Sequence, residues 1–126
     1  MGKYGILLVD DDSHLRKLYK GELEDEGYAV HTAASGMEAL QILEEDLILH
    51  NWGIDLVTLD ILMPGMDGIE VLRRIKEKSP CFPVIMSTAY DYQDDFSVWA
   101  SDAYVIKSAD LVKLKQTLKT LLGRNR

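Results

Sequence analysis

Short runs of apolar residues recur along the chain, separated by longer segments in which apolar residues stand three and four positions apart. Four of the runs are Ile6–Val9, Leu56–Leu59, Val84–Met86 and Tyr104–Ile106. Because these runs lack a regular polar alternation, they predict strands that are buried on both faces. A weaker strand is predicted near Ala29–Ala33. Strands of this kind are typical of a parallel sheet covered by helices on both sides.

The first two intervening segments predict helices with recognisable start signals. The first helix is expected to begin at Ser13, a favourable N-cap residue, and to end at Gly27. The second opens with a capping box, in which Glu38 follows Ser35 by three residues. The residues expected to face the core are Leu15, Leu18, Tyr19 and Leu23 in the first helix, and Ala39, Leu40, Ile42, Leu43 and Leu47 in the second.

Three further helices are predicted in the second half of the chain. One follows Asp67 and ends before Pro80, a short one is expected around Phe96 and Trp99, and the last is expected to start at Ser108. Their core-facing residues are expected to be Ile69, Leu72 and Ile75 in the first of these, and Leu111, Leu114, Leu118, Leu121 and Leu122 in the last.

The alternation of strands and helices predicts an α/β fold, a doubly wound sheet of five parallel strands with helices on both faces. A chain of 126 residues with 47 % hydrophobic content suffices for one core, and no repeat or linker-like stretch divides residues 1–126. We therefore expect a single domain. In such sheets, ligands bind beyond the carboxyl ends of the strands, so the residues directly after each strand are candidates for chemistry.

Six polar residues follow four of the predicted strands. They are Asp10, Asp11 and Asp12 after the first strand, Asp60 after the third, Thr88 after the fourth and Lys107 after the fifth. Carboxylates gathered at one edge repel one another and need a cation to stay ionised at neutral pH. Hard carboxylate oxygens suit Mg²⁺, which commonly binds through one or two carboxylates together with a phosphate.

The same residue types are suited to phosphoryl transfer. An aspartate can act as the nucleophile that accepts a phosphoryl group, while a lysine and a metal balance the charge on the phosphoryl oxygens. The Thr88 hydroxyl can donate a hydrogen bond to one of those oxygens. Asp12 also fits a structural role, because an aspartate at this position often only starts a helix. The site is predicted from the joint placement of these residues at four strand ends.

Four stretches resemble the signature blocks of response-regulator receiver domains of two-component systems: Leu8–Asp12, Leu59–Gly68, Ser87–Ala89 and Tyr104–Lys107. The blocks occur in the family's order over nearly the whole chain, and Asp-x-x-Met-Pro-x-Met-Asp-Gly, which begins at Asp60, is highly specific. The resemblance implies a flavodoxin-like receiver fold with strand order 2-1-3-4-5.

The resemblance also implies a function. A receiver accepts a phosphoryl group from a sensor histidine kinase or a phosphotransfer protein, and its change in conformation signals to a partner or output domain that these residues do not identify. The implied cofactor is Mg²⁺, with Mn²⁺ as an alternative. Such a domain is a switch rather than an enzyme with a separate substrate, and it promotes only its own phosphotransfer and dephosphorylation.

The roles of individual residues follow from their match to the receiver motifs. Asp60 matches the phospho-acceptor, Asp11 the direct Mg²⁺ ligand and Asp10 the ligand that acts through water. The backbone carbonyl of Leu62 completes the implied metal site together with Asp60.

Four further positions match the family's phosphoryl contacts, switch and rate-tuning positions. Thr88 and Lys107 match the hydroxyl and amine that contact the phosphoryl group, and Thr88 and Tyr104 match the switch pair. Tyr104 also fits an ordinary half-buried strand tyrosine. Leu62 and Tyr90 match the positions that flank the attacking water. Since neither is a short or acidic polar residue, a slowly decaying phosphorylated form is expected.

The sequence departs from the receiver pattern in three places. Ser108 stands where receivers usually have a proline joined by a cis peptide bond, and because a non-proline cis bond costs roughly 2.5–4 kcal/mol, we expect a trans bond and an altered turn. The second helical region, through Trp52, is a few residues longer than usual. The segment from Thr88 to Lys107 is shorter, which predicts a truncated fourth helix on the family's output surface.

The charge distribution bears on the partners. A net charge of −7 argues against nucleic-acid binding by this domain. Residues 107–126 nevertheless carry six basic residues against the single Asp110. A basic last helix fits an acidic partner, or a homodimer through the last strand and helices, and it also fits a solvated lysine face.

The remaining bulk features concern location. No apolar stretch approaches the roughly 18 residues that span a bilayer, and the start lacks the profile of a secretory signal. The lone Cys81 suits a reducing compartment. We therefore expect a cytoplasmic protein without membrane contacts.

Three other functions fit parts of the pattern. A magnesium-dependent phosphatase or nuclease uses a similar acid cluster, but it needs a cap or substrate groove for which 126 residues leave little room. A degenerate receiver that signals by binding alone would be favoured if Asp60, Asp11 or Lys107 were replaced, and all three are present. A flavodoxin-like redox carrier would have a Ser/Thr/Gly-rich phosphate loop where this chain has three aspartates.

Overall fold

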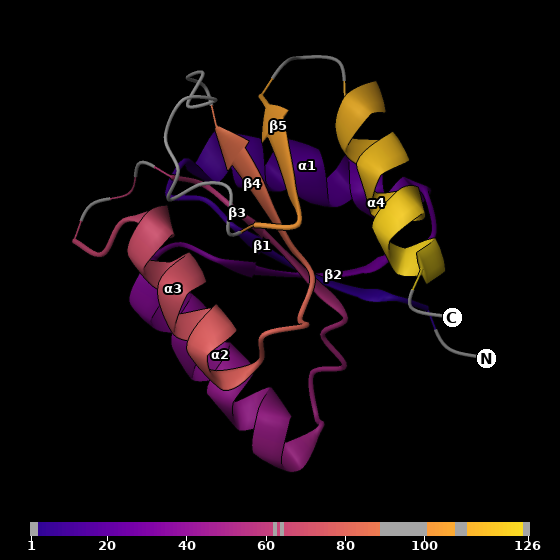
Figure 1. Ribbon diagram of the computed structural model, residues 1–126. Coiled ribbons are helices and arrows are strands. Elements are labelled where there is room, and N and C mark those ends of the chain that lie inside the picture. Colours follow the sequence, from indigo (N-terminus) through magenta and orange to yellow (C-terminus); the bar gives the residue numbers. More distant parts are fainter. Residues whose placement is uncertain (1–2, 62, 64, 89–100, 108–110, 125–126) are drawn as a thin grey trace.

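The computed structural model describes residues 3–61, 63, 65–88, 101–107 and 111–124. In this part of the chain, strands and helices alternate as the sequence predicts (Figure 1). The strands are β1 (Gly5–Val9), β2 (Ala29–Ala33), β3 (Leu56–Leu59), β4 (Val84–Thr88) and β5 (Ala103–Ile106). The helices are α1 (Ser13–Asp25), α2 (Gly36–Leu49), α3 (Gly68–Lys78) and α4 (Val112–Arg124).

The five strands form one parallel sheet in the order β2-β1-β3-β4-β5. The predicted doubly wound α/β fold and its strand order are confirmed. Since β1 pairs with both β2 and β3, the strand order reverses at β1. The carboxyl ends of β1 and β3 therefore lie next to each other at the point where sheets of this kind bind ligands.

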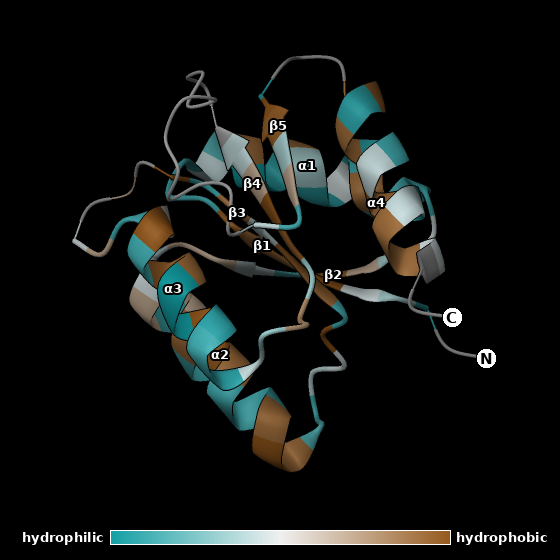
Figure 2. Ribbon diagram, viewed as in Figure 1, coloured by the Kyte–Doolittle hydropathy of each residue, from teal (hydrophilic) through white to brown (hydrophobic). Residues whose placement is uncertain are grey.

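Helices cover both faces of the sheet. Figure 1 shows α2 and α3 on one side and α1 and α4 on the other. Successive strand residues point to opposite faces, so Leu7 and Val9 belong to the core under α2 and α3, whereas Ile6 and Leu8 belong to the core under α1 and α4. The apolar runs of the sequence are explained by this two-sided burial, and Figure 2 shows brown, apolar stretches along β1 and β3 in the middle of the sheet.

The helix starts agree with the sequence, with one correction. Asp12, not Ser13, is the N-cap of α1, because its carboxylate accepts hydrogen bonds from the backbone N–H groups of His14 and Leu15 at 2.9 and 3.2 Å. Ser13 is already the first helical residue. The helix ends before Gly27, which has a φ of 98°, as the prediction required.

The capping box of α2 is present in a modified form. The Ser35 hydroxyl accepts from the backbone N–H of Glu38 at 3.2 Å, as expected. The Glu38 carboxylate accepts from the backbone N–H of Ala34 rather than of Ser35, at 2.9 Å. Asp67 caps α3 by accepting from the Glu70 N–H at 2.9 Å, and that helix ends before Pro80 as predicted.

Two residues predicted to face the core are exposed instead. Leu18 is 48 % exposed and Leu47 is 56 % exposed. Leu18 lies at the edge of the apolar stripe of α1, whose centre is formed by the buried Tyr19 and Leu23. Leu47 lies in the last turns of α2, which extend beyond the part of the helix that packs on the sheet (Figure 1).

The last helix begins later than predicted. Helix α4 starts at Val112, and the carbonyl of Leu111 accepts the hydrogen bond from the Lys115 N–H at 2.9 Å. Ser108 and the predicted helix around Phe96 and Trp99 lie outside the described residues. Among the helices that the structure describes, none combines the length and apolar character needed to cross a membrane.

Candidate functional site

The carboxyl ends of β1 and β3 place two aspartates side by side. Val9 pairs with Leu59, and the backbone N–H of Asp60 donates to the carbonyl of Val9 at 3.0 Å, so the strand ladder continues into the site. The N–H of Asp10 likewise donates to the Ala33 carbonyl at 3.1 Å. Both backbones are therefore held by the sheet, and the two residues are only 3 % and 7 % exposed for Asp10 and Asp60.

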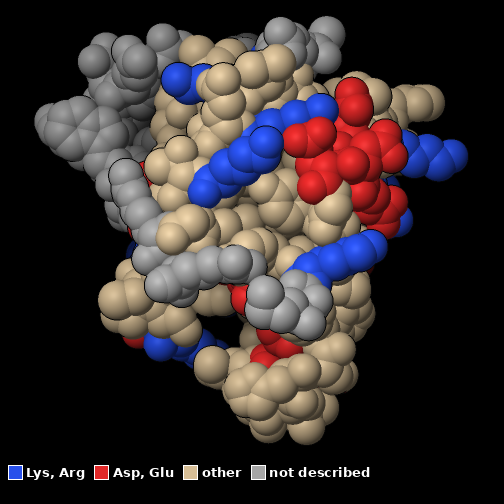
Figure 3. Space-filling view, turned by 90° about the vertical axis from the view of Figure 1, so that its right-hand side faces the viewer, with Lys and Arg blue, Asp and Glu red and all other residues tan. Residues whose placement is uncertain are grey.

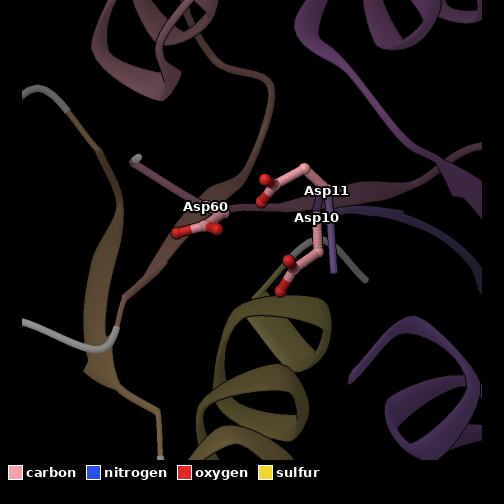
Figure 4. A group of neighbouring side chains, drawn as sticks. All are labelled: Asp10, Asp11 and Asp60. Carbon is pink, nitrogen blue, oxygen red and sulfur yellow. The ribbon is translucent and has the colours of Figure 1, made fainter. Parts of the chain in front are cut away.

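Three carboxylates converge at this edge. One oxygen from each of Asp10, Asp11 and Asp60 lies within 4.8 Å of the others (Figure 4). Asp10 and Asp60 are buried, whereas Asp11 is exposed and points toward the other two from above the strand ends. Buried like charges at such separations are stable only beside cations.

Lys107 supplies one positive charge from the end of β5. Its Nζ lies 2.5 Å from Asp10 Oδ2 and 3.1 Å from Asp60 Oδ2. Burial by itself lowers the pKa of the Lys107 ammonium, but the hydrogen bond to Asp10 and the charges of Asp60 and Asp10 outweigh it, so the pKa is raised above its ordinary value. Lys107 is therefore protonated at neutral pH and bridges two of the three acids.

The first turn of α1 fixes Asp10 from the other side. The backbone N–H of Asp12 donates to Asp10 Oδ1 at 2.9 Å, and Arg16 Nη1 donates to the Asp10 carbonyl oxygen at 2.7 Å. Asp12 itself turns away to cap the helix. The hydrogen bond from the backbone N–H of Leu15 is the main cause that lowers the pKa of the Asp12 carboxyl. The geometry therefore supports the role of Asp12 as a helix cap.

The donor set fits a divalent cation. Carboxylate oxygens are the ligands that Mg²⁺ prefers, and three of them are already close enough to share one ion. Lys107 neutralises only part of their charge. These three carboxylates therefore fit a divalent cation such as Mg²⁺, while the fourth ligand expected from the sequence, the Leu62 carbonyl, lies outside the described residues.

Comparison with known proteins decides the family. The response regulator receiver domain family matches residues 6–119. The chain belongs to this family. Its domain is therefore a phospho-acceptor switch of phosphorylation-dependent signalling, as the sequence motifs predict.

Two solved structures of one relative, a response regulator, are similar to this chain. The response regulator protein TrrA from Thermotoga maritima, in complex with Mg²⁺-BeF, is 43 % identical in sequence with a TM-score of 0.84, and the match covers 94 % of this chain and 98 % of that chain. A second structure holds TrrA in complex with the histidine kinase ThkA, with the same identity, TM-score and coverage.

Curated relatives are longer. The transcriptional regulatory protein ResD from Bacillus subtilis is 38 % identical over 124 residues, which are 94 % of this chain but 48 % of ResD. The uncharacterized transcriptional regulatory protein YkoG from the same organism is 35 % identical, over 99 % of this chain and 54 % of its own length. The receiver thus spans about half the length of the curated relatives that it matches.

The structure describes most, but not all, of the predicted site residues of the receiver. It brings together Asp10, Asp11, Asp60 and Lys107 at one edge. Tyr104 lies on β5, partly buried against the core under α2 and α3. The remaining predicted positions are described only in part or not at all. The backbone of Thr88 ends β4, but its side chain is not described, and Leu62, Tyr90 and Ser108 lie outside the described residues.

Gly68 is a supporting residue of the receiver to which the sequence motif alone assigns no role. Its N–H donates to the Ile61 carbonyl at 2.8 Å, and a Cβ at this position would overlap the carbonyl oxygen of Asp60. Only glycine lets the start of α3 approach the backbone of Asp60 this closely. The sequence feature that could have indicated this role is the short separation between Asp60 and Gly68 within one motif.

Two buried hydroxyls beside the acids were also missed. Among the described side chains, Thr58 and Ser87 are buried and their hydroxyl oxygens have no hydrogen-bond partner. Thr58 lies on β3 two residues before Asp60, and Leu59 pairs with Met86, so Ser87 is the β4 residue next to Asp60. Nothing in a sequence reveals an unsatisfied hydroxyl, since strand residues of this type usually find a partner.

Proposed function

We propose that residues 1–126 act as one receiver domain that accepts a phosphoryl group on Asp60. The observation that supports this choice is the setting of that carboxylate. It is 7 % exposed, its backbone is held by β1, and it lies 3.1 Å from the Lys107 ammonium and beside two further acids. Of the three clustered aspartates, Asp60 alone lies at the end of the central strand β3 and beside β4.

The transfer step needs little covalent chemistry from the protein. A carboxylate oxygen of Asp60 forms a bond to phosphorus while the donor's P–N or P–O bond breaks, and the electron pair leaves with the imidazole or carboxylate of the donor. The Lys107 ammonium, already within 3.1 Å of Asp60, balances the charge on the phosphoryl oxygens as the bond forms. Thr88 ends β4, and its hydroxyl would contact the same group, as the receiver motif implies.

The metal site belongs to the same proposal. Asp10, Asp11, Asp60 and the backbone carbonyl of Leu62 would hold Mg²⁺, with Mn²⁺ as an alternative of similar ligand preference. When bound, the ion supplies positive charge for the incoming phosphoryl oxygens. Without a cation, the pair of buried acids and the exposed Asp11 repel a dianionic phosphodonor.

Intact mass spectrometry after treatment with acetyl phosphate tests the assignment. One phosphoryl increment is expected with Mg²⁺ and none with EDTA or in Asp60→Asn. Asp25→Asn, which removes an exposed acid from α1, is the matched control and should take up one phosphoryl group like the wild type. An increment that survives Asp60→Asn would move the acceptor to another residue.

Family membership supports a proposal for the phosphodonor and for the place of action. We infer that the donor is a sensor histidine kinase or a phosphotransfer protein, supported by the complex between TrrA and ThkA in the relative. The domain would turn over no other substrate and would promote only its own phosphotransfer and dephosphorylation. We propose that it acts in the cytoplasm, a reducing compartment that suits the lone Cys81.

The signal is proposed to leave through β5 and α4. Phosphorylation would shift the population toward a state in which Thr88 and Tyr104 are rearranged, and the face with the exposed Ile106 and Val112 would then bind a second copy or an acidic partner. Sedimentation with and without a phosphoryl mimic measures that association. The mimic should increase association above the level seen without it, and Val112→Glu should abolish that increase.

The lysines of α4 are weaker candidates for this contact than their charge indicates. Lys115 lies 3.8 Å from Glu22, and Lys119 lies 3.8 Å from Glu26, both on α1. Figure 3 shows the strip of basic side chains next to a group of acidic ones on this face of the molecule. Two of the lysines therefore pair with acids of the same chain. This favours the interpretation of α4 as a solvated lysine face over that of a binding site for another protein.

The lifetime of the signal is proposed to be long for a receiver. Leu62 and Tyr90 stand at the positions that flank the attacking water, and neither offers a short polar side chain to hold it. The decay of the phosphorylated form should be timed for the wild type and for Leu62→Asn combined with Tyr90→Glu. A double variant that decays no faster than the wild type would place the control of the rate elsewhere.

A further inference from the structure

The C-terminal end of α2 carries an apolar surface that no described part of the chain covers. Leu47, Ile48 and Leu49 are 56, 71 and 61 % exposed, which makes three consecutive large apolar residues in contact with water. In Figure 2 this end of α2 is brown, and in Figure 3 the lowest part of the molecule is free of charged side chains. We call these three residues the apolar turn.

A hollow adjoins the apolar turn. It has a volume of about 590 Å³ and lies between α2 and α3, with Leu47 itself in its wall. Its apolar lining also includes Leu40, Leu43, Ile54 and Phe82. The same face of the molecule therefore offers both a projecting apolar group and a recess able to receive one.

The end of α2 is rigidly built. One Asp46 oxygen accepts from the backbone N–H groups of Trp52 and Gly53 at 2.8 and 2.9 Å, and the other accepts from Ile54 at 3.0 Å. His50 ends the helix in the left-handed conformation with a φ of 53°. The projection is thus held in place before any partner binds, which lowers the entropic cost of association.

The charges around the hollow identify the kind of partner. The residues that line the hollow include three acidic and three basic ones, in contrast to the net charge of −7 of the whole chain. They are Glu44, Asp46, Glu77, Arg73, Arg74 and Lys78. A rim of balanced charge attracts neither a strongly acidic nor a strongly basic partner, and it is the face on which two copies of an acidic chain repel each other least.

We propose that this face binds a second copy of the chain in a two-fold contact, with the apolar turn of each copy seated in the hollow of the other. A two-fold contact joins one patch to itself, so it needs a projection and a recess on the same patch and a rim that complements its own charges. The apolar turn and the hollow supply the first two, and the equal number of acidic and basic residues lining the hollow is compatible with the third. The acid site lies at the opposite end of the strands (Figure 1), so this association is independent of phosphorylation and of the contact proposed for β5 and α4.

Sedimentation velocity of the full chain without phosphodonor, over a series of concentrations, tests the proposal. The wild type should associate reversibly to a dimer with a Kd on the order of 100 µM, as expected of a small transient interface. Ile48→Glu should weaken that association at least about tenfold, because it buries an unpaired carboxylate at the contact. Asp60→Asn should leave it unchanged.

The matched control is Leu18→Glu, which places the same charge on an exposed leucine of α1 outside this face. It should dimerise as the wild type does, and circular dichroism should show that both variants are folded. A wild type that remains monomeric throughout the series overturns the proposal. Equal weakening by the two substitutions, or no weakening by Ile48→Glu, overturns it as well.

Discussion

The two ends of the molecule depart from the usual distribution of polar and apolar residues in opposite ways. At the carboxyl ends of the strands, the charged Asp10 and Asp60 are almost fully buried. At the C-terminal end of α2, the apolar Ile48 is 71 % exposed. The first arrangement costs the solvation of charges, and the second costs the hydration of apolar surface.

The way each end is stabilised explains why both persist. The buried acids depend on a residue from a distant part of the chain, since Lys107 reaches them from β5. The exposed turn depends on local contacts, since Asp46 binds three backbone N–H groups that follow within eight residues. Long-range pairing therefore supports the site, and short-range capping supports the projecting end of α2.

The largest effect is expected when the long-range pairing is broken. Lys107→Met should lower the free energy of unfolding by about 3 kcal/mol in EDTA, because it leaves Asp10 and Asp60 buried without a cation. Added Mg²⁺ should recover part of the loss. Urea denaturation measures both. Lys78→Met is the control, since its pair with Glu44 is exposed at the surface and should matter little. A loss no larger than that of the control would show that the acids need no lysine.

Asp46→Ala should have an intermediate effect. Removing an acceptor of three backbone N–H groups should cost about 2 kcal/mol, and Asp46→Asn should cost less because it keeps one acceptor oxygen. Burial raises the pKa of Asp46, but the N–H groups of Ile54, Trp52 and Gly53 outweigh it, so the pKa lies below its ordinary value of 3.8.

The direction of the Asp46 pKa shift determines how the effect of Asp46→Ala depends on pH. A lowered pKa in the folded state stabilises the fold above the ordinary carboxyl pKa, and the contribution is lost as the pH falls through the lowered value. The difference in stability between wild type and Asp46→Ala should therefore be constant near neutral pH and shrink below about pH 4. A difference that grows on acidification would contradict the assigned contacts.

A smaller effect, of opposite sign, is expected beside the acid site. Thr58→Val replaces a buried hydroxyl that has no partner by a methyl group of the same shape, which should raise the free energy of unfolding by about 1 kcal/mol. Thermal unfolding measures it. Thr32→Val, at a partly buried threonine of β2, controls for the strand preference of valine. A destabilised Thr58→Val variant would mean that the hydroxyl has a bound partner in solution.

The smallest effect is expected at the apolar turn. Ile48→Ser should change the free energy of unfolding by less than about 0.5 kcal/mol at protein concentrations where the chain is monomeric, since the side chain is mostly exposed. The same urea experiment serves. A loss of more than about 1 kcal/mol would show that Ile48 packs within its own chain, and the contrast between the two ends would disappear.

Much of the fold was predictable from local pattern. The strands buried on both faces, the Ser35 cap of α2 and the glycine stop of α1 follow from hydrophobic period and backbone preference, which act over a few residues. The errors arose where two local signals competed or where burial depends on distant neighbours. Asp12, not Ser13, is the cap of α1. Leu18 and Leu47 have apolar side chains at helical spacing, but no other element among the described residues buries them.

The sequence by itself determined the residue types of the site and the edge at which they gather. Asp10, Asp11, Asp60 and Lys107 each follow a predicted strand, and parallel strands bring their carboxyl ends together. What only the tertiary structure decided is how these charges divide their contacts: Lys107 bridges Asp10 and Asp60, and Asp11 stays exposed. The exposed end of α2 and its hollow were also decided there. Such features depend on distances between elements that are far apart in the chain. Local hydrophobic period and capping preference carry no information about these distances.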